Sequence, residues 1–326
     1  MSMPPVARRL GAMMLLAAAV AAASWSCGHA AADPLAPVFD DAFWRQWGDG
    51  KAELSGYDLV QPRYGQKRDG VAVTIFVTET FSNSLRVKSD PGKHPKSDEF
   101  PVMKLNLVED FPTGIYDYNL MTSTFVALDA VNGRSAGNAT KISFSSQEWC
   151  GNVFAQALFD ATSIRHESHS YFDGEADHEE TLPYSEGGLA EDALLLWARG
   201  LAAPVLKPGE SRSVDVMKSL KTARLLHQPV TWQKAKLTRS AQSQKIKVPA
   251  GAFDVEVRTA EIEGGRTWTF YVELAEPRRV VKWEVSDGEE AQLLASDRLV
   301  YWQMNGKGFE SSLAKLGLKP RGARMP

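Results

Sequence analysis

Residues 246–302 decide the fold, and they read IKVPAGAFDVEVRTAEIEGGRTWTFYVELAEPRRVVKWEVSDGEEAQLLASDRLVYW. Phe253, Val255 and Val257 alternate with charged residues, and this period of two places the apolar side chains on one face of a β-strand. One pair of glycines, Gly264-Gly265, and the sequence Ser-Asp-Gly supply turns between such runs. The same alternation returns over 268–272 and 281–285, and two further short runs follow at 292–295 and 299–302. The segment therefore predicts a meander of neighbouring antiparallel strands.

The rest of the chain follows the same pattern, with apolar runs separated by polar, proline- or glycine-containing turns. Helical spacing of apolar residues is limited to 39–47, which has one aromatic face, and 189–201, with a weaker signal at 309–316. Strands are expected over 51–60, 70–80, 103–108, 115–127, 211–216 and 229–238, and 141–159 and 161–172 are expected to form one long hairpin followed by a polar loop at 173–180. The prediction is a mainly β protein, a large curved antiparallel sheet with one or two packed helices, in a single domain over 33–326.

The first 32 residues have the features of an export signal and linker. Arg8 and Arg9 precede an apolar run over 10–23 that is too short to span a bilayer, and small residues follow it. Cleavage after Ala32 would release a periplasmic protein, whereas cleavage before Cys27 would leave a lipid-bearing cysteine. The sequence favours neither ending. It predicts an exported protein, periplasmic or anchored to the outer membrane as a lipoprotein, whose membrane contact is limited to that anchor.

Composition excludes some partners and one kind of framework. The net charge of −3 is close to neutral and both signs are mixed along the chain, so we expect no nucleic-acid partner. Only two cysteines are present, so at most one disulfide can form and the fold must depend on a buried core.

Two groups of residues have the chemistry for an active or metal site. His166, His169 and His178, interspersed with glutamates, are the densest cluster of metal-ligating residue types. On a strand, however, positions 166 and 169 face opposite sides of the sheet, so we expect no metal and no cofactor. Cys150 is expected to lie in a strand as a small buried thiol, and no hydrolase, phosphate-binding or dinucleotide motif is present. No catalytic residue is predicted; an enzyme using Cys150 or the His166/His169 region is the alternative.

Large aromatic side chains of the meander share the predicted concave face. They either pack beneath the helix predicted at 189–201 or line a cavity for a lipid or other apolar ligand. The candidate cavity residues are Phe253, Trp268, Phe270 and Trp283, with Trp197 from the helix.

Three phrases resemble those of a family of exported bacterial β-proteins. They are VPAGAFDV at 248–255, WTFY at 268–271 and PRRVVK at 277–282. Such proteins are similar in fold to the lipoprotein carriers LolA and LolB, antiparallel half-barrels with a helical lid over an apolar interior; most are domains of unknown function, and some are labelled septum formation inhibitor. The resemblance implies a non-catalytic binding or envelope-associated protein that holds a lipid or other apolar group in its concave face. A ligand-free structural envelope protein is a further alternative, and no protein partner is implied.

Overall fold

The computed structural model describes residues 35–320. The predicted export signal at 1–32, including Cys27, lies outside the described residues. Those that are described belong to one compact unit.

A single sheet of fifteen strands dominates this unit. Its order is β8-β7-β6-β5-β4-β3-β2-β1-β15-β14-β13-β12-β11-β10-β9, and neighbours pair antiparallel except β9 with β10. The bounds are β1 (Ala52–Arg63), β2 (Gln66–Ser82), β3 (Glu99–Thr113), β4 (Tyr116–Ala127), β5 (Ala139–Glu148), β6 (Gly151–Phe159), β7 (Ser163–Ser170), β8 (His178–Pro183), β9 (Leu189–Ala190), β10 (Ser211–Met217), β11 (Trp232–Val248), β12 (Gly251–Ile262), β13 (Thr267–Glu273), β14 (Val280–Val285) and β15 (Glu290–Leu299). The predicted fold class, a mainly β protein with one large antiparallel sheet, is confirmed.

The helices are few and short. They are α1 (Asp41–Trp47), α2 (Leu194–Ala198) and α3 (Leu220–Leu226), with 3-10 turns η1 (Lys96–Asp98), η2 (Glu191–Ala193), η3 (Tyr301–Gln303) and η4 (Phe309–Leu316). Asp40 caps α1 by accepting the amides of Ala42 and Phe43, and Trp47 on its inner face packs against Phe76. The predicted helix at 39–47 is therefore confirmed, apart from its first residues.

Several element predictions were wrong. The stretch 189–201 holds β9, η2 and only five helical residues, because the carboxylates of Glu191 and Asp192 bond to the start of α3 instead of capping a longer helix. Residues 141–172 form three strands, since the chain turns at 149–150. The loop predicted over 173–180 ends earlier, because 178–180 already belong to the strand 178–183. The last run of the meander, 299–302, ends β15 and enters η3.

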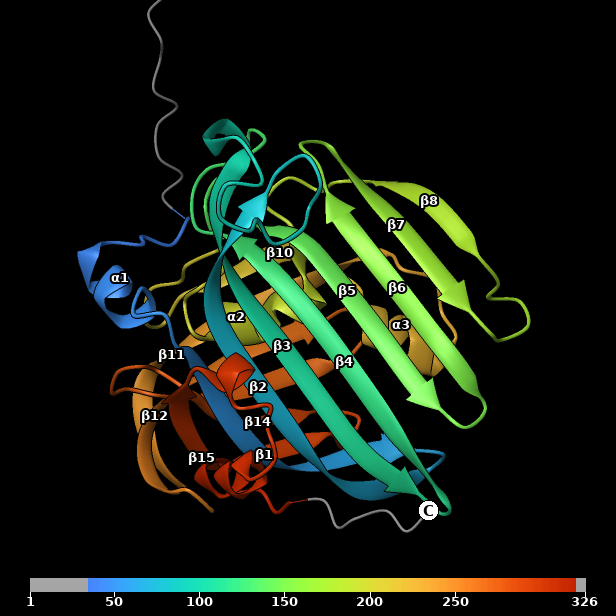
Figure 1. Ribbon diagram of the computed structural model, residues 1–326, viewed down its shortest axis with the longest axis vertical. Coiled ribbons are helices and arrows are strands. Elements are labelled where there is room, and N and C mark those ends of the chain that lie inside the picture. The colour runs from blue at the N-terminus through green and yellow to red at the C-terminus, as the bar shows by residue number, and fades with distance from the viewer. Residues whose placement is uncertain (1–34, 321–326) are drawn as a thin grey trace, which may run out of the picture. The chain divides into compact units, whose positions relative to one another are not determined.

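The sheet curls around α2 and α3, which lie behind β3–β6 in Figure 1. Thr124 Oγ1 on β4 donates to the carbonyl of Asp192 in η2, whereas Trp197 of α2 meets the edge of Phe270 on β13. These contacts come from opposite halves of the strand order. The two edge strands are also close in the chain, because residues 184–188 alone connect β8 to β9, and Trp232 Nε1 of β11 donates to the carbonyl of Pro183 at 2.9 Å. The main core fills the space inside this curl.

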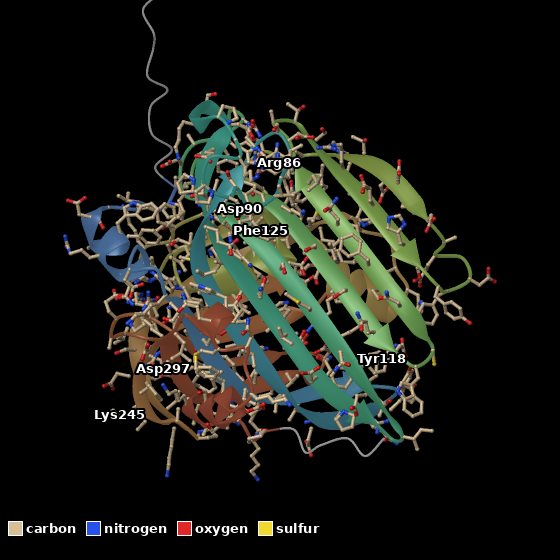
Figure 2. All side chains as sticks on the ribbon, viewed as in Figure 1. Arg86, Asp90, Tyr118, Phe125, Lys245 and Asp297 are labelled. Carbon is tan, nitrogen blue, oxygen red and sulfur yellow. The ribbon has the colours of Figure 1, made fainter. Side chains whose placement is uncertain are left out.

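The convex side of the sheet carries smaller apolar clusters. Phe125 stacks on Phe81 there, at the opposite end of β4 from Tyr118, whose ring stacks on Phe111 in the main core (Figure 2). The apolar interior is therefore concentrated on the concave side, where any internal site has to be found.

Candidate functional site

The five aromatic residues predicted to line a cavity lie in the main core or against it. Trp197, Phe270 and Trp283 are fully buried, Trp268 is buried, and Phe253 is half-buried. The rings of Trp268 and Phe270 stack with centroids 5.6 Å apart, and Trp197 meets Phe270 edge-on. The structure thus packs Phe270 against Trp268 and against Trp197 of α2, and packing of the meander's aromatic residues beneath this segment was one of the two alternatives that the sequence left open.

Little space remains beside these rings. The cavity between Trp268, η2 and β3–β4 measures about 30 Å³, enough for one or two waters. The indole N–H groups are also satisfied internally, because Trp197 donates to the Pro204 carbonyl, Trp268 to Glu191 and Trp283 to Glu289. Ligand binding by these residues stays a prediction. In the structure they belong to the hydrophobic core or pack against it.

A larger pocket of about 680 Å³ lies elsewhere on the concave face, between β6–β8 and α3. The apolar residues of its lining come from β6, α3 and the segment after α3, and they are called the apolar floor below. The floor residues are Val153, Ala155, Leu220, Ala223, Pro229 and Val230. The volume falls in the range of ligand pockets, roughly 300–1,000 Å³.

Small side chains explain why this part of the interior stays open. The residues of β6, β7 and the β7–β8 loop that line the pocket include the small residues Ala155, Ser168, Ser170, Gly174 and Ala176. On the other half of the sheet, large buried rings, among them Trp268, Phe270 and Trp283, belong to the main core. Because side chains fill cores to near-crystalline density, a run of small residues leaves a void unless a helix moves in. Here α3 stays at a distance, and the void is the pocket.

One wall of the pocket is ionisable. His166 lies on β7 opposite Glu180 on β8, and Ser168 lies opposite His178. Glu180 Oε1 is 3.0 Å from Nδ1 of His166 and 3.5 Å from Nε2 of His178. The ligand atoms of these three residues all lie within 4.8 Å of one another. His166 is buried, whereas His178 is exposed and Glu180 half-buried, so the cluster faces the pocket from the rim inward.

The facing wall belongs to α3 and its C-terminal residue. His227 has a left-handed backbone, which ends α3, and its Nδ1 contacts the Glu175 carboxylate from the β7–β8 loop. Arg224 is fixed by Glu148 at 3.2 Å and lies over the ring of Phe172. Charged and imidazole groups therefore surround an apolar floor on two sides.

The expectation that His166 and His169 face opposite sides of the sheet is confirmed. His166 faces the pocket, while His169 stacks on Phe154 on the convex side and contacts Asp177. The neighbours of His166 in this cluster, His178 and Glu180, were missed because 178–180 was interpreted as a loop. The alternation of His178 and Glu180 about Glu179 was the available signal, since a period of two aligns both with His166 across a hairpin.

Cys150 differs from its prediction. It lies in the turn between β5 and β6 and is exposed, with exposed Trp149 beside it. A buried strand position was expected because 141–159 was predicted to be one arm of a hairpin; the chain instead turns at Trp149 and Cys150, directly before Gly151. It does not line the pocket.

Comparisons with known proteins show a distant likeness of fold. No protein-family model matches the chain, and no curated protein matches it. Among solved structures it is similar to the crystal structure of a beta-barrel-like protein of the domain of unknown function DUF1849 from Brucella abortus, at 11% identity and a TM-score of 0.44, over 76% of this chain and 98% of that one.

Proposed function

We propose that this protein is an exported, non-catalytic binding protein that holds an apolar ligand, such as one acyl chain, in the pocket between β6–β8 and α3. The single observation that carries the proposal is a cavity of about 680 Å³ on the concave face with an apolar floor, beside an otherwise filled core. A protein that needed only a stable fold would gain by covering the apolar lining of this pocket, because apolar surface left in contact with water is unfavourable.

Binding would draw its free energy from the floor of the pocket. Each methylene buried against Val153, Leu220, Ala223 and Val230 contributes about 0.8 kcal/mol. The ionisable walls would then orient the polar end of the ligand, since a few fixed polar groups give a pocket its specificity. A chain with a single polar end fits this distribution better than a uniformly polar molecule.

Export is supported by the sequence of residues 1–32, with its basic start and short apolar run. Among the residues that the structure describes, no helix combines the length and apolar character needed to cross a membrane. On the strength of the predicted export signal, we place the protein in the periplasm or, through a lipid on Cys27, on the outer membrane.

A dansyl-labelled fatty acid tests the proposal by fluorescence titration. The matched variants replace an alanine with phenylalanine inside the pocket, Ala223→Phe, and on an exposed strand position outside it, Ala241→Phe. We expect the wild-type protein and Ala241→Phe to bind the probe equally. We expect Ala223→Phe to weaken binding about tenfold or more, since the added ring occupies the cavity.

Equal binding by Ala223→Phe and the wild type, with both proteins folded by circular dichroism, would contradict the proposed location. If Phe253→Ala were the one variant that lost binding, the ligand site would lie in the aromatic half of the interior instead. Absence of binding to any apolar probe would favour a structural envelope protein.

A further inference from the structure

We infer that His166, His178 and Glu180 bind a divalent transition-metal ion, with Zn²⁺ the best match, and leave one coordination position open toward the pocket. The inference deepens the proposed function, on which it rests for the open position, because the ion would give the apolar pocket a fixed polar anchor. The ligand class that follows is an apolar molecule ending in an anionic oxygen group such as a carboxylate.

The spacing of the ligand atoms fits zinc. Zn²⁺ bonds to histidine nitrogen and carboxylate oxygen at about 2.0–2.2 Å, so two ligands of a tetrahedral site lie roughly 3.3 Å apart. Glu180 Oε1 lies 3.0 Å from His166 Nδ1 and 3.5 Å from His178 Nε2, and the three atoms fall within 4.8 Å. Both distances to Glu180 Oε1 are close to that spacing, so binding of one ion by all three requires that the two imidazole nitrogens also come to about 3.3 Å from each other.

The donor set also fits. Two imidazoles and one carboxylate suit Zn²⁺ and neighbouring divalent transition metals better than Ca²⁺ or Mg²⁺, which prefer oxygen ligands. Three protein ligands with an open fourth position are the usual arrangement of zinc sites that take an exogenous ligand, whereas structural sites are closed by four.

The backbone makes the cluster rigid. His166 is paired directly with Glu180, and His178 is two residues from Glu180 on the same face of β8. All three side chains therefore project from one antiparallel hairpin into the pocket, and buried His166 is held against β6 through the pairing with Ala157. Side chains that are already held in this way lose little conformational entropy when an ion binds.

A hydrogen-bonded hairpin surface without metal is the competing interpretation, in which Glu180 only accepts from the two imidazoles. That interpretation accounts for both contacts to Glu180, but it gives no role to the position of the cluster at the wall of an open pocket. The two interpretations differ in zinc affinity, which can be measured directly.

The experiment is a calorimetric titration of the chelator-treated full chain with ZnCl₂, without any apolar probe. We expect one ion per chain in the wild type, and a dissociation constant raised by roughly tenfold or more in His178→Ala and in Glu180→Gln. Both positions lie on edge strand β8, where His178 is exposed and Glu180 half-buried. We therefore expect these two variants to fold, even if a substitution of buried His166 prevents folding.

The matched control is His169→Ala, which removes an imidazole from the same strand but from the convex face. Its dissociation constant should equal that of the wild type. Uptake of no zinc by the wild type, or equal affinity in His169→Ala, His178→Ala and Glu180→Gln, would overturn the site.

Co²⁺ substitution tests the open position. We expect visible absorption bands typical of four-coordinate cobalt, and a change in those bands when octanoate is added but not when octanol is added. Bands that octanoate leaves unchanged would overturn the open position. Probe binding that persists in Glu180→Gln while zinc binding is lost would separate the two proposals, leaving the apolar pocket intact without its ion.

Discussion

Lys221 Nζ on α3 lies 2.8 Å from a carboxylate oxygen of Glu109 on β3, and both side chains are buried. The same amine lies 3.0 Å from Glu289, which precedes β15 in the other half of the sheet. One cation thus joins α3 to both halves. Burial favours the neutral amine, but the two carboxylates outweigh it and raise the pKa of Lys221 above its ordinary value, so the amine stays charged.

Removal of this cation leaves two carboxylates buried together. We expect Lys221→Met to lower the free energy of unfolding by about 3–5 kcal/mol, because an uncompensated buried charge costs more than the ion pair contributes. Urea denaturation measures this. Lys218→Met is the control, since the amine of Lys218 donates to the side chain of exposed Gln228, and the substitution should change stability by about 0.5 kcal/mol or less. Equal effects of the two substitutions would contradict the anchoring role of Lys221.

Asp192 predicts a pH dependence of stability. Its carboxyl accepts from Ser219 Oγ at 2.6 Å and from the Leu220 amide at 3.0 Å, and burial raises its pKa from 3.8 to about 6. The native state therefore binds this proton more tightly than the unfolded state does. The stabilisation is complete below pH 3.8 and is lost as the pH rises through 6.

The expected loss from this group is on the order of 2–3 kcal/mol between pH 4 and pH 7, at about 1.4 kcal/mol per pKa unit. Asp192→Asn cannot titrate at this position and loses one of the two accepted hydrogen bonds, so it starts less stable than the wild type. As the pH rises from 4 to 7, the difference in free energy of unfolding between the two proteins should shrink, because only the wild type loses this stabilisation. Urea denaturation of both proteins at several pH values tests this. Parallel stability curves would show that Asp192 does not titrate there.

Local alternation was enough to predict most of the sheet. Between Phe253 and Val285 the period of two, with turns that contain glycine or proline, gave β12, β13 and β14 with errors of a few residues at their ends. These strands have one face in the main core, and burial of one face is what imposes the period on the sequence.

The elements that were missed have buried polar residues. Helix α3 contains Lys221 and Arg224, which are buried in ion pairs, so its sequence lacks the apolar periodicity of a packed helix. Likewise the wall of the pocket depends on the pairing of His166 with Glu180, which only the register of the β7–β8 hairpin supplies. The alternation of His178 and Glu180 along the chain indicates a shared face, but it does not indicate that His166 lies opposite them, so the candidate site could not be predicted from the sequence.

Phe270 tests whether the aromatic half of the interior is core. It is fully buried between Trp268 and Trp197, so we expect Phe270→Ala to lower the free energy of unfolding by about 3–5 kcal/mol. Phe253→Ala removes a half-buried ring of the same kind and should cost clearly less. Urea denaturation ranks the two, and the reverse order would mean that the packing around Phe270 is loose.

Cys150 predicts accessible thiol chemistry in the native protein. Because its side chain is exposed in the β5–β6 turn, iodoacetamide should label it as completely in native buffer as in urea. Peptide mass spectrometry locates the label, and Cys150→Ser, which should lose it without loss of stability, is the control. Protection of Cys150 until the protein unfolds would contradict the exposed turn.

Gly56 predicts how the C-terminal segment is held. The pairing of β1 with β15 shifts register between Gly56 and Tyr57, and a methyl group on Gly56 would lie 2.2 Å from the Leu316 carbonyl oxygen, inside any permitted contact. Gly56→Ala must therefore displace η4, whose Leu316 is buried against β1 and β2. We expect a loss of about 1–3 kcal/mol of stability, as for other overpacked sites, and faster proteolysis between η3 and the end of η4.

Gly306→Ala, where the added methyl would have no neighbour closer than 3.9 Å, is the matched control for urea denaturation and limited proteolysis. If both variants were cleaved at the wild-type rate, the close approach of η4 to β1 would not be what fixes this segment.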